Sequence, residues 1–226
     1  GIPFRRPPGM LPFRTAPSTE LNDAAYVPYF FAATFGLTDQ QTQLLSLWLT
    51  AALMSPGPYP VLHLIGAPSS DKEMLARVVK ALVDPSDSDL VQKPREAKDL
   101  FFVAHGTHVV ALASMATLPQ SMAEAVRSIA TGGSLARPKM YDDQGIVLTR
   151  VQKPVILLST SDVVGDWGLR LCRLRIQFED AEGHDRQPLG QVWDSFRADQ
   201  PHLLAGLLQA VSCSLANASA HRGSHF

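Results

Sequence analysis

Apolar positions along the chain recur with two different periods, and the switches between them predict the order of the secondary-structure elements. Spacings of three and four residues are typical of amphipathic helices, whereas short apolar runs are typical of buried parallel strands. The helical segments are 38–53, 71–83 and 119–131. The strand-like segments are 59–66, 109–112 and 154–159. Because helices separate these strands, the sequence predicts an α/β fold on a mainly parallel sheet.

Three more segments complete the predicted architecture. Residues 135–141 and 146–151 flank a turn sequence and predict a β-hairpin. Residues 171–178 alternate basic and apolar side chains, which is typical of an edge strand with one solvated face. The stretch 188–217 has a helical pattern and is expected to break near Pro201.

The chain of 226 residues is long enough for one large domain, and we expect two short extensions around it. Residues 1–36 are predicted to form an extended arm and an aromatic segment, because prolines and arginines dominate the start and aromatic residues follow. Residues 37–217 are predicted to form a single α/β domain, and residues 218–226 a tail.

Composition narrows the function classes. Hydrophobic residues make up 46% of the chain, enough for a core, and 20 basic against 21 acidic residues give a net charge of -1. This balance argues against a polybasic nucleic-acid binder but leaves room for a local basic face. Cys172 and Cys213 form no disulfide framework, and no apolar stretch reaches the length of a membrane span. We therefore expect a cytoplasmic protein without membrane contact.

One loop matches half of a phosphate-binding motif. In the pattern G-x-x-x-x-G-K-[ST], a loop between strand and helix turns backbone N–H groups toward phosphate oxygens. Gly66 and Lys72 have the matching spacing, but Asp71 replaces the second glycine and Glu73 replaces the hydroxyl residue that holds magnesium. Two carboxylates then compete with an incoming phosphate. The alternative, which we favour, is a helix that starts with a capping box of Ser70 and Glu73.

The order of several motifs resembles a family of bacterial ATP-binding proteins. These motifs are 57–66, 75–85, 94–100, 130–133 and 153–157. They are similar to P-loop NTPases of the AAA+-like helicase type, found in plasmid- and phage-associated replication modules. The resemblance covers about residue 39 to residue 217. It implies a three-layer P-loop NTPase-like fold with a mainly parallel central sheet, an N-terminal arm and C-terminal helices.

The resemblance also implies where a nucleotide would bind. The matching candidates for cofactor binding are Gly66, Ser69, Ser70, Lys72 and Arg170. The family's magnesium-orienting acid falls on Ala113, and its polar sensor falls on Leu158. Phosphoryl transfer depends on a metal and on fixed cations around the phosphates. The chain is therefore interpreted as a degenerate, catalytically silent member with no catalytic residue, no metal site and no required cofactor.

Basic residues of the predicted hairpin are candidates for nucleic-acid contact. They are Arg137, Lys139, Arg150 and Lys153. In the related helicase-type proteins a basic hairpin often faces DNA, but a solvated face explains such charges equally well. The pair His105 and His108 has no carboxylate or thiol at ligand spacing, so we interpret it as a turn before a strand rather than a metal site.

Three hypotheses follow. The first is a P-loop NTPase-like scaffold or interaction module without catalysis, which would bind an unidentified protein partner. The second is a weak ATPase that uses Lys72 and binds ATP with Mg²⁺ at a residual site. The third is an accessory domain that contacts DNA. AAA+-like relatives commonly form rings, so an oligomer is compatible with each of them.

Overall fold

A computed structural model describes residues 7, 9–15, 24–68, 70–87, 90–92, 94–138, 146–178 and 188–223. Within these residues the helices are α1 (Tyr26–Phe35), α2 (Asp39–Leu53), α3 (Lys72–Val83), α4 (Ala97–Gly106), α5 (Gln120–Thr131), α6 (Trp167–Leu171) and α7 (Leu189–Gly223). The strands are β1 (Val61–Ile65), β2 (Val110–Met115), β3 (Gly133–Pro138), β4 (Ile146–Val151), β5 (Val155–Ser159) and β6 (Arg173–Gln177).

The central sheet confirms the predicted α/β class. Its four strands are all parallel and lie in the order β2-β5-β1-β6. Every residue of β1 and β5 is buried, as expected from their continuous apolar runs. A parallel bridge between Val91 and Leu112 extends the sheet beyond β2.

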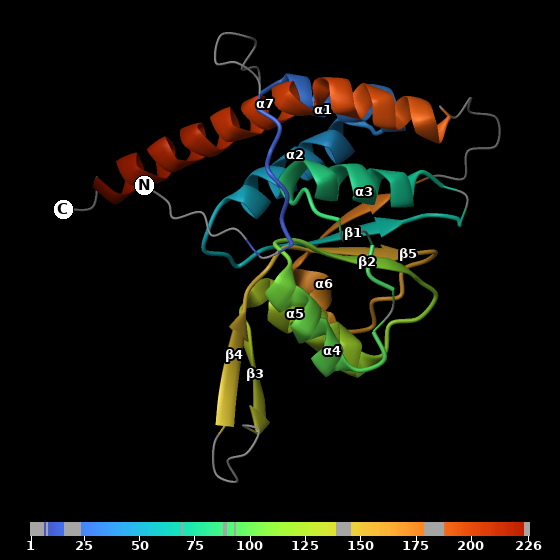
Figure 1. The fold of residues 1–226 in the computed structure, drawn as a ribbon, viewed down its shortest axis with the longest axis vertical. Coiled ribbons are helices and arrows are strands. Elements are labelled where there is room, and N and C mark those ends of the chain that lie inside the picture. The colour runs from blue at the N-terminus through green and yellow to red at the C-terminus, as the bar shows by residue number, and fades with distance from the viewer. Residues whose placement is uncertain are drawn as a thin grey trace.

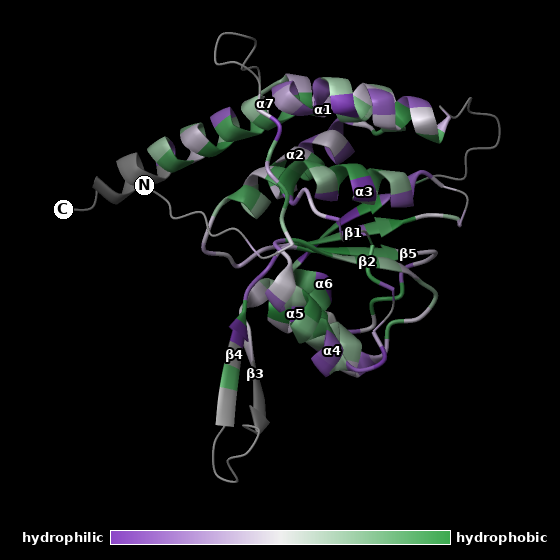
Figure 2. Cartoon of the chain, viewed as in Figure 1, coloured by the Kyte–Doolittle hydropathy of each residue, from purple (hydrophilic) through white to green (hydrophobic). Residues whose placement is uncertain are grey.

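Helices cover both faces of the sheet and create two separate cores (Figure 1). Helices α1, α2, α3 and α7 lie on one face, which we call the upper face, and α4, α5 and α6 lie on the lower face. Alternate residues of β1 point to opposite cores: Leu62 and Leu64 belong to the upper cluster and Val61 to the lower one. Figure 2 shows that the strands between these layers are strongly hydrophobic.

Helix α2 starts as the sequence predicts. The Thr38 hydroxyl accepts a hydrogen bond from the Gln41 backbone N–H at 3.3 Å, and the Gln41 side chain accepts one from the Thr38 N–H at 3.0 Å. This reciprocal capping box satisfies two donors that a helix start leaves open. Trp48 then anchors the helix in the core, because its Nε1–H donates to the Pro60 carbonyl at 2.8 Å.

Helix α7 contradicts the predicted break near Pro201. The helix runs without interruption from Leu189 to Gly223 with the proline inside it. A proline inside a helix removes one backbone hydrogen bond, which destabilises an isolated helix. Here Phe196 on one side of Pro201 and Leu203 and Leu207 on the other are all buried in the upper core. Packing on both sides therefore keeps the helix continuous.

The aromatic segment before residue 37 includes helix α1. Val27, Phe30 and Phe31 of this helix are buried in the upper core, and the rings of Phe30 and Phe31 meet edge to face at 5.4 Å. The helix ends at Gly36, whose φ of 63° is the left-handed conformation that glycine adopts without strain. None of the helices in the described part of the chain has the length and hydropathy of a membrane span.

The predicted hairpin is present and leaves the body of the molecule (Figure 1). Strands β3 and β4 pair antiparallel, with Ser134 opposite Arg150 and Arg137 opposite Val147. At the base, Gly132 has a φ of 98°, which strongly favours glycine. The turn itself, residues 139–145, lies outside the described residues, and Lys139 with it.

Candidate functional site

The fold brings two loops together at the carboxyl ends of β1 and β5. These strands are neighbours, with Leu64 opposite Leu158. The chain leaves β1 toward α3 on the upper face and leaves β5 toward α6 on the lower face (Figure 1). In open α/β sheets, such a reversal opens the crevice where ligands bind. The Gly66 N–H donates to the Ser159 carbonyl at 3.2 Å, so the first residues of the two loops lie side by side.

The first loop, which contains the predicted phosphate-binding residues, closes on itself. The Ser70 N–H donates to the Ala67 carbonyl at 2.9 Å, and the Lys72 Nζ donates to the same carbonyl at 2.6 Å. Lys72 is completely buried. Burial lowers the pKa of its ammonium group, while the Glu73 carboxylate acts in the opposite direction. The amine of Lys72 is thus a donor within its own loop.

The start of α3 corrects the predicted capping box of Ser70 and Glu73. The N-cap residue is Asp71, and its side chain makes no capping hydrogen bond. The Ser70 Oγ is buried without a hydrogen-bond partner among the described residues. The hydroxyl packs against Gly66 instead, since a Cβ added to Gly66 would lie 2.6 Å from it. Gly66 is therefore needed for close packing inside the loop, and Ser69 lies outside the described residues.

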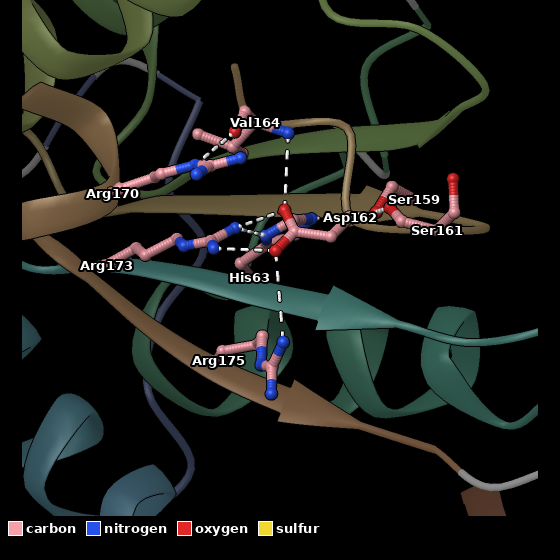
Figure 3. Close-up of polar contacts among 8 residues, drawn as sticks. All are labelled: His63, Ser159, Ser161, Asp162, Val164, Arg170, Arg173 and Arg175. Carbon is pink, nitrogen blue, oxygen red and sulfur yellow. Dashed lines mark hydrogen bonds and ion pairs between the residues drawn. The ribbon is translucent and has the colours of Figure 1, made fainter. Parts of the chain in front are cut away.

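The second loop, residues 160–166, is held by a network of polar side chains that sequence reasoning missed (Figure 3). Arg173 of β6 forms two hydrogen bonds with Asp162, at 2.6 and 2.8 Å, and its Nη1 also donates to His63 Nδ1 at 2.9 Å. His63 Nε2 lies 2.7 Å from the Ser159 Oγ, which donates to the Ser161 carbonyl at 2.6 Å. The network ties the loop to β1 and β6.

The direction of these hydrogen bonds determines the state of His63. A guanidinium group can only donate, so Nδ1 is the acceptor and the ring proton sits on Nε2. Nε2–H then donates to Ser159. Complete burial, with a contribution from the Arg173 charge, lowers the pKa of His63 from 6.5 to about 4. His63 is therefore neutral at pH 7 and does not act as a base toward the Ser159 hydroxyl.

The side chains of the network lie on the lower face of the sheet. Arg173, Arg175, His63 and Ser159 alternate with upper-core residues such as Ile176 along their strands. Hydrogen bonding to Arg173 holds the pKa of Asp162 well below its usual range. A lone histidine inside the apolar run 61–65 was the one signal in the sequence, since its partners lie about 100 positions away and meet it only through the sheet order.

Arg170 belongs to this second loop rather than to the first. Its Nε donates to the Val164 carbonyl at 2.6 Å, and its side chain is exposed on α6. The hydrogen bonds of the described residues thus join Arg170 to the 160–166 loop and Lys72 to the 66–72 loop. The structure brings Gly66, Ser70 and Lys72 together, with Arg170 on the neighbouring loop.

The structure describes the basic hairpin residues in less detail. Arg150 is exposed and lines a shallow hollow at the hairpin base together with Gly132, Gly133, Ser134, Val151 and Gln152. Lys153 follows β4 and is half-buried, with its N–H donating to the Ile129 carbonyl at 2.9 Å. Arg137 lies in β3, and only its backbone pairing is described.

Of the two histidines considered as metal ligands, His108 has a structural role, whereas His105 is exposed at the end of α4. The His108 N–H donates to Asp84, and its Nε2 lies 2.8 Å from the Ala52 carbonyl. Asp84 also forms a buried ion pair with Lys80 at 2.7 Å. Across the residues that the structure describes, no group of three metal-ligating side chains comes together. Leu158, at the sensor position, is completely buried in the upper core.

Comparison with known proteins shows which solved structures and which family the chain resembles. Two solved structures share its fold: the A form apo structure of the NrS-1 C-terminal region comprising residues 305–718 (TM-score 0.53, 10% identity, 86% of this chain and 46% of that one), and the A form apo structure of the NrS-1 C-terminal region (TM-score 0.52, 11% identity, 86% and 48%). The chain thus spans about half the length of these proteins. A ligand-bound JCV helicase is also similar (TM-score 0.48, 13% identity, 84% and 54%). No curated protein matches the sequence.

A family model matches residues 31–223, from the second half of α1 to the last residue of α7. The match therefore includes the whole central sheet, both loops at its carboxyl edge and the projecting hairpin. The model describes a replication protein of actinomycete integrative conjugative elements. The chain accordingly belongs to the family of actinomycete integrative conjugative element replication proteins.

Proposed function

We propose that this member of the replication-protein family is a P-loop NTPase-like domain, with three layers and a degenerate nucleotide loop, that does not hydrolyse ATP. It acts in the cytoplasm as a scaffold or interaction module for a protein partner of the replication machinery. The single observation that supports this proposal most is the position of Lys72. Its amine donates to the Ala67 carbonyl of its own loop at 2.6 Å, where a phosphate-binding lysine needs to face a ligand.

The charges beside Lys72 support the same conclusion. Asp71 and Glu73 place two carboxylates at the N-terminus of α3, where the helix dipole otherwise attracts anions. The side chain of Ala113 in β2 carries no carboxylate that could bind or orient a magnesium ion. A triphosphate at this loop would meet negative charge and would lack a metal ligand on β2, so both binding and phosphoryl transfer are disfavoured.

Calorimetric titration with Mg-ATP tests the proposal. The unmodified chain is expected to give no binding heat, while the double variant Asp71→Gly/Glu73→Thr, which restores the motif, should gain weak binding without turnover because Ala113 is unchanged. Asp39→Gly/Glu124→Thr, two exposed acids on α2 and α5, is the matched control and should leave ATP binding absent. Magnesium-dependent ATP binding by the unmodified chain that Lys72→Met removes would instead establish a nucleotide site that uses Lys72.

The hairpin favours a second candidate function, contact with DNA. A two-stranded ribbon that leaves the body of the molecule has the width to enter the major groove (Figure 1). Arg150 is exposed near its base. Replacing Arg150 with glutamine is then expected to weaken DNA binding and to lower its salt dependence. An unchanged affinity for DNA at low salt would remove the hairpin from consideration.

A further inference from the structure

Strand β6 lies at an edge of the central sheet, and its backbone groups point alternately toward β1 and away from it. The Val61 N–H donates to the Cys172 carbonyl at 2.8 Å. At the other end of the strand, the Phe178 N–H donates to the Ile65 carbonyl at 2.7 Å. Because a parallel pairing uses every second residue, the even-numbered residues from 172 to 178 bond to β1. The N–H and C=O groups of the odd-numbered residues between them therefore face outward.

Most of these outward groups have no partner among the described residues. No described strand pairs with β6 on its outer side. The Gln177 carbonyl accepts a hydrogen bond from the Gln41 side chain of α2 at 2.8 Å, so α2 covers the carboxyl end of the edge. No described residue forms a hydrogen bond with the backbone N–H or C=O of Arg173 or Arg175. An accessible edge with unpaired backbone groups is a template for a further strand.

The side chains on the lower face of β6 favour an acidic neighbour. Arg173 and Arg175 both point toward Asp162 (Figure 3). Asp162 accepts two hydrogen bonds from Arg173, at 2.6 and 2.8 Å, whereas its 3.8 Å contact with Arg175 is longer than a hydrogen bond. Two guanidinium groups against one carboxylate leave one positive charge, and the Arg175 side chain that carries it is 52% exposed. A carboxylate opposite Arg175 on an added strand would pair with this charge.

The upper face of β6 favours an apolar neighbour. Leu174 is half-buried and packs against the upper core, and Ile176 is completely buried in it. Side chains of an added strand alternate between the two faces of the sheet. A strand that matches β6 therefore alternates acidic residues on the lower face with apolar residues on the upper face.

We propose that the outer edge of β6 binds an extended acidic segment of a protein partner, which adds an antiparallel strand to the central sheet. The inference rests on the proposed function as an interaction module, and it names the place and the chemistry of the partner. Arg173 and Arg175 each exchange two backbone hydrogen bonds with the residue opposite. These bonds supply affinity, and the Arg175 charge selects acidic segments.

The same edge disfavours two other occupants. A second copy of the chain, paired edge to edge through its own β6, would place basic residues opposite basic residues. Like charges directly opposite each other destabilise a pair of strands. The backbone of DNA offers acceptors without alternating donors, so it would leave the outward carbonyls of Arg173 and Arg175 unpaired.

Amide hydrogen exchange of the whole chain tests the added strand directly. The probe is a short synthetic peptide that alternates glutamate with valine. At saturation the outward amides of Arg173, Arg175 and Gln177 are expected to exchange about tenfold more slowly or less. The amides of Leu174 and Ile176 already bond to β1, so they are internal controls whose rates should stay the same.

Charge reversal tests the selection of acidic segments. Arg175→Glu is expected to weaken binding of the glutamate peptide about tenfold and to favour a peptide with lysine in place of glutamate. Arg95→Glu changes an exposed arginine just before α4 and should leave binding unchanged. Thermal unfolding confirms that each variant keeps its fold. A peptide N-methylated on its glutamates needs no change to the chain and should not bind, because it lacks the N–H groups that pair with β6.

Several outcomes would overturn the proposal. No slowing of exchange at Arg173 and Arg175 would show that no strand is added. Equal binding of the N-methylated peptide, or an equal loss in Arg95→Glu, would indicate attraction by charge alone. Slowing that grows with protein concentration without peptide would indicate a second copy, and displacement of the peptide by DNA would indicate nucleic acid. The Mg-ATP titration is read independently, so a failure of strand addition is distinguishable from nucleotide binding.

Discussion

Two loops leave adjacent strands at the same edge of the sheet, and they differ in whether the basic side chains bound to them are buried or exposed. In the 66–72 loop, Lys72 is completely buried and donates to a carbonyl of its own loop. In the 160–166 loop, Asp162 binds the largely buried Arg173 and lies 3.8 Å from the exposed Arg175, and the Val164 carbonyl accepts a hydrogen bond from the exposed Arg170. The loop that has the spacing of a phosphate-binding motif keeps its lysine inside, whereas the loop without a motif is contacted by arginines from α6 and β6, two of which are exposed.

The difference shows that the surroundings of a cation decide what it can bind. A buried lysine whose amine already donates to a carbonyl is poorly placed to bind an anion. A guanidinium at the surface with unused N–H groups is better placed to do so. Motif spacing alone places Lys72 correctly along the chain but says nothing of its partner. The following predictions test this contrast between the two loops, from the largest expected effect to the smallest.

Replacing Arg173 with methionine should give the largest loss of stability. Asp162 would keep one backbone donor and a distant arginine, and His63 Nδ1 would lose its donor. Breaking a largely buried charge pair in this way costs about 2–4 kcal/mol. Urea unfolding measures the change. Arg175→Met removes the same charge at an exposed position and should cost less than about 0.5 kcal/mol; equal losses would show that Arg173 holds no network.

Stability should fall as the pH is lowered from 7.5 to 5. The pKa of His63 is about 4 in the folded chain against 6.5 when exposed, so the unfolded chain takes up the proton first in this window. The stabilisation is complete above pH 6.5 and is lost toward pH 4, with a decrease of about 2 kcal/mol by pH 5. Burial also lowers the pKa of His108, which adds to the effect.

The pH dependence can be assigned by substitution. His63→Gln should flatten most of the change in unfolding free energy between pH 7.5 and 5. His105→Gln alters an exposed histidine at the end of α4 and should leave the pH dependence intact. A pH dependence that survives His63→Gln unchanged would assign it to other groups and would contradict the buried neutral state of His63.

Ser159→Ala should produce an intermediate effect. The hydroxyl accepts from His63 and donates to the Ser161 carbonyl, so its removal leaves a buried ring N–H unpaired. The expected loss is about 1–2 kcal/mol in unfolding free energy. Ser212→Ala, at an exposed position of α7, serves as the control and should be neutral. A neutral Ser159→Ala would show that the hydrogen bond to His63 is not needed.

Lys72→Met should produce the smallest effect. Methionine keeps the apolar stem and removes a buried charge, while the Ala67 carbonyl still accepts from Ser70. The gain from removing a desolvated amine offsets the lost hydrogen bond, so stability should change by less than about 1 kcal/mol. A loss as large as that expected for Arg173→Met would contradict the contrast between the two loops.

Local patterns predicted much of this fold. The strands β1 and β5 and the capping box at Thr38 follow from apolar runs and from residues a few positions apart. The failures concern packing that the pattern does not show. Helix α7 continues through Pro201 because Phe196 on one side and Leu203 and Leu207 on the other are buried in the upper core. Ser70 makes no cap because its hydroxyl packs against Gly66, four residues earlier, a close contact that the residue types alone do not predict.

In the candidate site, too, the features set by local sequence were predicted and those set by tertiary contacts were not. The 66–72 loop was located by its spacing between strand and helix, which is a local property. The polar network around His63 was not, because Asp162 and Arg173 meet His63 only through the order of β5, β1 and β6 in the sheet. The alternation of Arg173 and Arg175 predicted one solvated face. Only Arg175 matches that interpretation, since Arg173 is largely buried.

The most direct test of the account is phosphate release from Mg-ATP by the purified chain, measured with and without DNA. The account predicts no release above the buffer blank in either condition, because Lys72 is held within its loop and no acid stands at position 113. Turnover that requires magnesium and disappears in Lys72→Met, while that variant remains folded, would contradict it.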